Sequence, residues 1–317
     1  MTRSRPRVRR RTVTAVLLAL VLLAAGAVWS NALGAKDKLR EVASRIELLV
    51  DPPPDRPIAA TVLVTPRPGE AADDEDTSDA SPEPSAVATA PASTAPGEDP
   101  ADPTPTAKPT PARVSVDVNL FKHPENHFIS EQFDHTWCAV AGTQMVLNMW
   151  GKAPLTVAFQ KQLASGIGQW ESRRDSHNGG WGPSAMVAAL AAYGVPGYEV
   201  RAYESRWDAL FDAAKAIEKT HAPVLLLAWR GAHTWVMTGF RADADPLQFD
   251  DARISGAYIN DPWFPLISSI WGPSDPPGSF VDRPGMRVNY LPWKRPEGSY
   301  PDRDGLFIAV VPTKANR

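Results

Sequence analysis

The sequence predicts an α+β domain over residues 113–317, in which one buried helix packs against a mostly antiparallel sheet. The first observation behind this prediction is a run of apolar residues after Cys138, which suits a helix buried on most sides and closed by a glycine. The second is a pair of apolar runs with strand character, residues 223–229 and 233–240. The third is a short strand-like run, residues 256–261, that stops before a proline.

The composition limits the number of domains and excludes several classes of protein. The first 112 of the 317 residues do not resemble a packed domain, and the remaining stretch of about 205 residues is long enough for one substantial core. The formal net charge of -3 gives no argument for nucleic-acid binding, and none is expected. Cys138 is the only cysteine, so a disulfide within the chain is impossible.

The N-terminus predicts attachment to a membrane. Six arginines fall within the first eleven residues, so residues 1–12 form a basic tail that should stay in the cytoplasm. The apolar stretch that follows, residues 13–34, is roughly 20 residues long and is predicted to be a single transmembrane anchor. The C-terminal domain would then lie outside the cytoplasm, at the cell membrane. Small residues before Ala35 leave a cleaved signal peptide, and therefore secretion, as the alternative.

Two further segments separate this apolar stretch from the domain. Residues 35–50 are predicted to form a short helix with one apolar stripe. The stripe consists of Leu39, Val42, Ile46 and Leu49. Residues 51–112 are rich in proline, alanine, threonine and acidic residues, so they cannot bury enough apolar surface to fold and are predicted to be a disordered linker. A small strand within residues 60–64 is possible, but it would be isolated.

The segment that ends at Cys138 has the features of a nucleophile site. Cys138 is expected at the N-terminus of the predicted helix, where the helix dipole favours the thiolate, which is the nucleophilic form of cysteine. Gln132 lies six residues earlier, and a loop of that length can bring its amide beside the Cys138 backbone N–H. Two such donors can form an oxyanion hole. An inert buried cysteine remains an equally good interpretation of this segment taken alone.

A base and an orienting carboxylate are predicted at two strand ends. His233 opens the strand that follows a predicted tight turn at residues 230–232, and Asp261 ends a later strand. There Asp261 can accept the second imidazole N–H, which selects the tautomer and supports the imidazolium. Asn260 is a lesser candidate for the same role, because its side chain should point to the opposite face. A helix-opening Cys, a strand-opening His and a strand-ending Asp are in the relation that a catalytic triad needs.

These motifs together resemble papain-like cysteine peptidases of the group related to the bacteriocin-leader-processing, or C39-like, peptidase domains. The resemblance covers roughly residues 119–311 and rests on three segments: residues 132–138, 231–240 and 259–263. It implies a papain-like fold, hydrolysis of peptide bonds by a thiol, and a peptide or protein as substrate. It also implies that Cys138, His233 and Asp261 form the triad and that Gln132 contributes to the oxyanion hole. No cofactor is implied.

Other functions remain open on the sequence alone. Cell-wall amidases and endopeptidases, transglutaminase-like enzymes and acyltransferases also use a cysteine and a histidine. A catalytically inactive papain-like module that binds partners is the non-enzymatic alternative, since ten of the eleven tryptophans follow residue 113 and can line a groove. A metal site is not predicted, because the histidines lack ligand spacing, although His123 and His127 are four apart.

Overall fold

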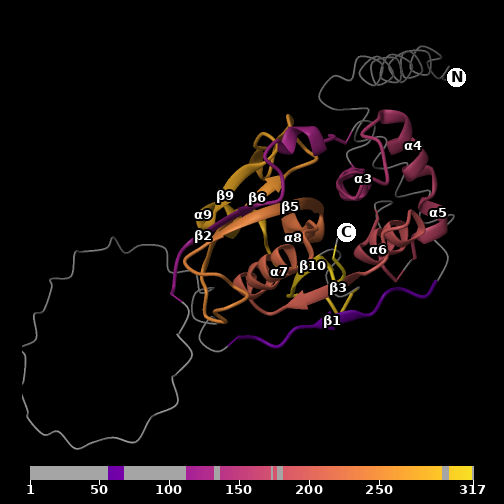
Figure 1. Cartoon of the computed structure of the whole chain (residues 1–317). Coiled ribbons are helices and arrows are strands. Elements are labelled where there is room, and N and C mark those ends of the chain that lie inside the picture. Colours follow the sequence, from indigo (N-terminus) through magenta and orange to yellow (C-terminus); the bar gives the residue numbers. More distant parts are fainter. Residues whose placement is uncertain are drawn as a thin grey trace, which may run out of the picture.

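The fold is taken from a computed structural model of the chain (Figure 1). The structure describes these residues: 56–67, 112–131, 136–172, 174–176, 181–294 and 300–315. The predicted basic tail, the anchor or signal peptide and the short helix, residues 1–50, lie outside the described residues. Among the helices of the described part, none is both long enough and apolar enough to span a bilayer.

The centre of the domain is a single large sheet (Figure 1). Its strands follow the order β1 (Thr61–Leu63), β3 (Tyr198–Tyr203), β10 (Phe307–Pro312), β4 (Val224–Leu227), β5 (His233–Ala242), β6 (Ile254–Asn260) and β9 (Ser279–Asp282), and β2 (Val116–Asn119) pairs with β5. Every pairing in it is antiparallel except that of β1 with β3. The prediction of an α+β domain with a mostly antiparallel sheet is confirmed.

Helices cover both faces of the sheet. On one side lie the 3-10 helix η3 (Pro124–His127) and the helices α3 (Cys138–Met149), α4 (Val157–Ser165), α5 (Ile167–Trp170) and α6 (Pro183–Ala192). On the other side lie α7 (Arg206–Thr220) and α9 (Arg283–Asn289). Neighbouring strand residues alternate between the two cores: Val236 of β5 belongs to the α3 side, whereas Trp235 and Met237 belong to the α7 side.

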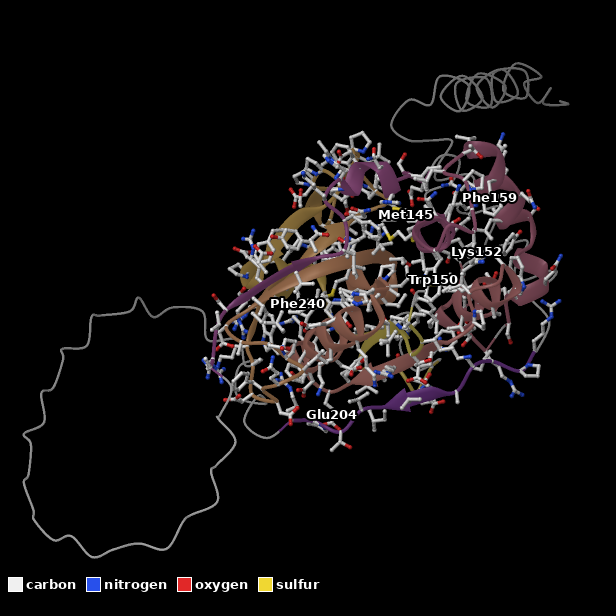
Figure 2. All side chains as sticks on the ribbon, in the orientation of Figure 1. Met145, Trp150, Lys152, Phe159, Glu204 and Phe240 are labelled. Carbon is white, nitrogen blue, oxygen red and sulfur yellow. The ribbon has the colours of Figure 1, made fainter. Side chains whose placement is uncertain are left out.

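The helix α3 packs closely on the sheet. Met145 is fully buried between α3 and the sheet, and Phe240 is fully buried in the core of the opposite face (Figure 2). A Cβ added at Gly142 would lie 3.0 Å from the methyl group of Thr234, so this glycine permits α3 to approach β5. Gly151 has φ +67 and its N–H bonds to the carbonyl of Asn148, which ends the helix as predicted.

The connection between β4 and β5 differs from the predicted tight turn. The first strand ends at Leu227, two residues earlier than expected, and residues Ala228–Gly231 form one helical turn, α8. Trp229 and Arg230 there have φ values of 52° and 61°, in the left-handed region that side chains other than glycine rarely adopt. No local sequence signal predicts this conformation, because tryptophan and arginine normally avoid the left-handed region. Its consequence is that the Trp229 ring turns toward His233.

Part of the predicted linker belongs to the domain. Residues 56–67 lie along the sheet and the helices, and they contain β1, which pairs in parallel with β3 and is therefore not isolated. Arg56 exchanges hydrogen bonds of 3.1 and 2.9 Å with the hydroxyl of Ser172, and Arg67 forms a 2.7 Å ion pair with Asp208. The prediction of a disordered linker over residues 51–112 is thus wrong for residues 56–67. Residues 68–111 lie outside the described part.

The chain after Trp263, for which the sequence predicted no role, completes the fold. It forms a small hairpin of β7 (Ile267–Ser268) and β8 (Gly272–Pro273), followed by β9, α9 and β10. Strand β10 lies in the interior of the sheet, between β3 and β4, and all of its residues are buried. The domain therefore needs its C-terminal residues for a complete sheet.

Candidate active site

The structure places Cys138 where the apolar pattern predicted it, as the first residue of α3. The side chain is buried, with 7% of the residue exposed. The free N–H groups of a helix N-terminus and the helix dipole favour negative charge at this position. Cys138 therefore lies at the position on α3 that the nucleophile hypothesis requires.

His233 and Asp261 form a short, buried hydrogen bond. The imidazole Nε2 lies 2.6 Å from Oδ1 of Asp261, and the two residues are only 2% and 5% exposed. His233 opens β5, and Asp261 directly follows β6, its antiparallel neighbour, so the pairing of the strands brings the two ends together. The same carboxylate oxygen accepts a 2.8 Å bond from the N–H of Trp263, which holds it in place.

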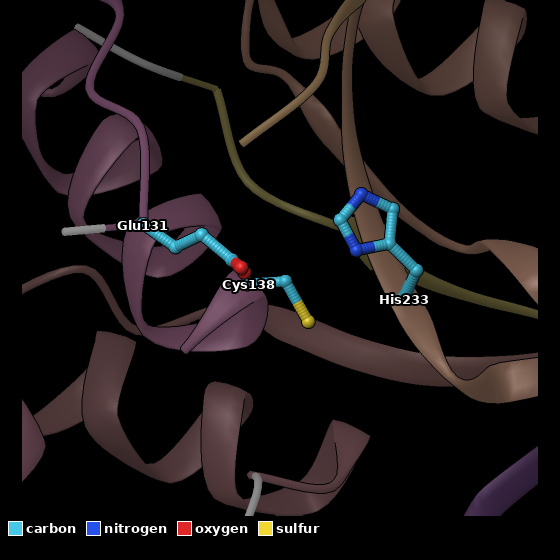
Figure 3. A group of neighbouring side chains, drawn as sticks. All are labelled: Glu131, Cys138 and His233. Carbon is cyan, nitrogen blue, oxygen red and sulfur yellow. The ribbon is translucent and has the colours of Figure 1, made fainter. Parts of the chain in front are cut away.

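The thiol of Cys138 lies on the other side of the imidazole. The sulfur of Cys138, a ring nitrogen of His233 and a carboxylate oxygen of Glu131 all lie within 4.8 Å of one another (Figure 3). Because Nε2 is engaged by Asp261, Nδ1 is the nitrogen left for Cys138. The structure thus brings Cys138, His233 and Asp261 together in the predicted order.

The charge state of His233 follows from these neighbours. Burial acts to lower the pKa of His233, but the charges of Asp261 and of Cys138, together with hydrogen bonds to both, outweigh it and raise the pKa to about 10. The imidazole therefore carries a proton throughout the neutral pH range. A protonated imidazole beside a cysteine is the partner that a thiolate requires.

We expect the domain to become less stable between pH 6.5 and about 10. A histidine whose pKa is raised on folding contributes stability that is complete below 6.5 and is lost as the pH passes the folded value. The loss should be on the order of a few kcal/mol, and urea unfolding across this window measures it. Asp261→Asn should flatten the dependence, whereas Asp251→Asn, at an exposed ion pair with Arg113, should not. An equally steep curve for both variants would contradict the assignment.

Tryptophan rings enclose the imidazole. Trp229 stacks on His233 with ring centroids 4.0 Å apart and 19° between the planes. Trp263 meets the same ring edge-on at 6.3 Å, and Trp271 stacks on Trp229 at 5.9 Å. These rings shield the His233–Asp261 pair from water, and a lower local dielectric strengthens its hydrogen bond. The sequence showed many tryptophans but could not tell which of them lie at the site.

The other predicted site residues are placed differently. Gln132 lies outside the described residues. The side-chain amide of Asn260 donates a 3.5 Å bond to the carbonyl of His127. The ring nitrogens of His123 and His127 bond to Glu125 and Asn148 respectively, so this pair does not converge on a common point.

Glu131 is the site residue that sequence reasoning missed. It directly precedes Gln132 and carries no motif of its own, so its only sequence signal was its position beside a residue with a proposed role. Its backbone N–H donates a 3.0 Å bond to the carbonyl of Pro262, the residue after Asp261. This bond ties the segment before α3 to the strand end that holds the carboxylate.

One comparison with known proteins found a similarity that covers the site. Residues 126–272 match the Peptidase_C39 like family, and this range contains Cys138, His233 and Asp261. No curated protein and no solved structure matched the chain. The match agrees with the resemblance to papain-like, C39-like peptidases that the sequence motifs indicated. Over these residues the chain is similar to the Peptidase_C39 like family.

Proposed function

We propose that the domain is a thiol peptidase that hydrolyses peptide bonds with Cys138, His233 and Asp261 as its triad. The observation that carries the proposal is the buried 2.6 Å bond between His233 and Asp261 with the helix-opening Cys138 on the opposite side of the ring. An inert structural cysteine has no need of a protonated, oriented histidine beside it. The family match supports a peptidase and, with it, a peptide or protein substrate.

The proposed chemistry follows from the position of each group. The Cys138 thiolate attacks the substrate carbonyl carbon, and the charge that develops on the carbonyl oxygen is held by the Cys138 backbone N–H and the Gln132 amide. His233 gives its proton to the leaving amine, which leaves a thioester on Cys138. The neutral imidazole then takes a proton from water, whose attack releases the acid and restores the thiolate. Asp261 keeps Nε2–H pointing away from the thiol throughout.

The role of Gln132 gives a test that separates acyl transfer from simple thiol reactivity. Gln132→Ala should leave alkylation of Cys138 by iodoacetamide nearly unchanged, because alkylation forms no tetrahedral oxyanion. The same variant should lower turnover of a peptide by about 10²–10³-fold, the usual cost of one oxyanion donor. Gln144, a buried glutamine of α3 whose amide donates to the carbonyls of Pro154 and Thr156, is not suitable as a control. Gln248→Ala, on the exposed loop between β5 and β6, is the matched control.

The cellular placement is a separate part of the proposal. We place the domain outside the cytoplasm at the cell membrane, held by residues 13–34 as a single-pass anchor, on the strength of the arginine flank and the apolar length. Protease added to intact cells with an envelope permeable to the protease should release the domain, and failure to release it would contradict this placement. A mature N-terminus at Ala35 would instead favour the secreted form.

A further inference from the structure

Three buried side chains of different chemistry lie close together at the N-terminus of α3. Glu131, Cys138 and His233 are 8%, 7% and 2% exposed, and one donor atom of each lies within 4.8 Å of those of the other two (Figure 3). They come from the segment before α3, from the first turn of α3 and from the start of β5. Sequence spacing could not reveal the set, because its members lie in distant parts of the chain.

The three donors are a carboxylate oxygen, a thiolate sulfur and an imidazole nitrogen, which together suit zinc. Zn²⁺ accepts all three ligand types and is commonly held by three protein side chains with a fourth position left open. Mg²⁺ and Ca²⁺ prefer sets made of oxygen alone, so the sulfur and the nitrogen select against them.

The surroundings of His233 strengthen this reading. Zinc-bound histidines usually donate their other ring N–H to a carboxylate, which orients the ring. His233 does so to Asp261 at 2.6 Å, and Asp261 is itself held by the N–H of Trp263. The nitrogen that faces Cys138 and Glu131 is thereby positioned to bind a metal.

The distances allow a tetrahedral ion after a small adjustment. Ligand atoms at 2.0–2.3 Å from tetrahedral zinc lie about 3.3–3.7 Å apart. The three donors lie within 4.8 Å of one another, so they would have to close by about 1.5 Å at most. The long side chain of Glu131 can make that movement by rotating its own torsions.

We propose that Glu131, Cys138 and His233 bind Zn²⁺ and that the bound ion inhibits the reaction of the Cys138 thiolate. The thiolate and the Glu131 carboxylate together balance the two charges of the ion, and the proton that His233 carries at Nδ1 leaves to solvent. With its sulfur bound to zinc, Cys138 gives electron density to the ion and is a weaker nucleophile, and the ion blocks the approach of a carbonyl carbon. This zinc site goes beyond peptide hydrolysis. It shares Cys138 and His233 with the proposed triad, but it also requires Glu131, which has no part in the triad.

The test measures zinc binding and thiol protection in the full chain, without reliance on turnover. Metal-stripped protein is titrated with Zn²⁺ against a chromophoric chelator, and alkylation of Cys138 by iodoacetamide is followed in parallel. We expect one equivalent of zinc to bind and to slow alkylation at least tenfold, and excess chelator to restore the rate. Mg²⁺ and Ca²⁺ at the same concentrations should leave the rate unchanged.

Glu131→Gln is the decisive variant, because it removes one ligand and leaves Cys138 and His233 in place. We expect it to weaken zinc binding by at least about tenfold, because a neutral amide oxygen is a poorer ligand for Zn²⁺ than a carboxylate. Protection is expressed as the ratio of alkylation rates without and with zinc, so any change in the metal-free rate cancels. Glu125→Gln is the matched control, since Glu125 also lies beside a histidine, His123, but on the surface. Thermal melting of each variant shows whether it is folded.

Each outcome decides the question. The proposal is overturned if Glu131→Gln binds zinc as tightly as the unchanged chain does, or if neither of the two proteins binds zinc. The proposal is supported if Glu131→Gln binds zinc more weakly than the unchanged chain, Cys138→Ala does not bind it, and the Glu125→Gln control binds it normally. If Cys138 resists alkylation even without metal, the peptidase proposal fails, and the chelator titration still reports whether zinc binds.

Discussion

Removal of the His233 imidazole should lower peptide turnover on the order of 10⁶-fold, the scale expected when a triad loses its base. His233→Ala takes away both the proton donor for the leaving amine and the positive partner of the thiolate. The same variant should slow alkylation of Cys138 at pH 6, where a free thiol is almost entirely protonated and a thiolate paired with imidazolium is not. Asp261→Ala should have a smaller effect on alkylation, because Asp261 orients the base but does not contact the sulfur.

Cys138→Ser provides a second test of the triad, and His127→Ala provides its control. Serine at position 138 keeps a small polar side chain but lacks the thiolate, so turnover should fall as far as with His233→Ala. His127 also has a ring nitrogen engaged in a hydrogen bond, at 2.8 Å to Asn148, but it lies outside the site, so His127→Ala should retain turnover in the folded protein. If Cys138 is unreactive at pH 6 and at pH 8, and His233→Ala changes nothing, the domain is a papain-like binding module instead.

Local sequence signals were sufficient to predict where Cys138, His233 and Asp261 stand on their helix and strands. The apolar run after Cys138 ends at Gly151, and that pattern defines a helix whose first residue is the cysteine. His233 and Asp261 stand at the ends of apolar runs, and antiparallel pairing of neighbouring runs brings such ends together. Each of these inferences needed only the spacing of apolar residues and the position of glycine or proline.

The features that the sequence could not predict depend on contacts between distant segments. Strand β1 is too short to be distinguished from its proline-rich surroundings, and only its pairing with β3 makes it a strand. The left-handed turn at Trp229 costs conformational energy locally, and the contacts that Trp229 gains with His233 and Asn289 exist only in the folded domain. Glu131 enters the site for the same reason, through its backbone bond to Pro262.

The largest effect on stability should come from a second buried ion pair, between Asp175 and Arg303. Arg303 is 2% exposed and Asp175 is fully buried, and the guanidinium bonds to the carboxylate at 2.7 Å and to the Asp175 carbonyl at 3.1 Å. The two carboxylate oxygens also accept the N–H groups of Ser184 and Ala185 at the start of α6. Asp175 therefore caps α6, which packs against α3, and joins it to the loop before β10.

Asp175→Ala should lower the free energy of unfolding by about 3–5 kcal/mol, because it leaves the Arg303 guanidinium buried without a counter-charge. It also removes the acceptor of two backbone N–H groups at α6, whose desolvation is then uncompensated. Urea unfolding of the folded variant measures the loss. Asp251→Ala is the matched control: Asp251 and its partner Arg113 are 78% and 38% exposed, so the midpoint of unfolding should change little. Equal midpoints for the two variants would show that the Asp175–Arg303 pair does not stabilise the attachment of α6 to the loop before β10.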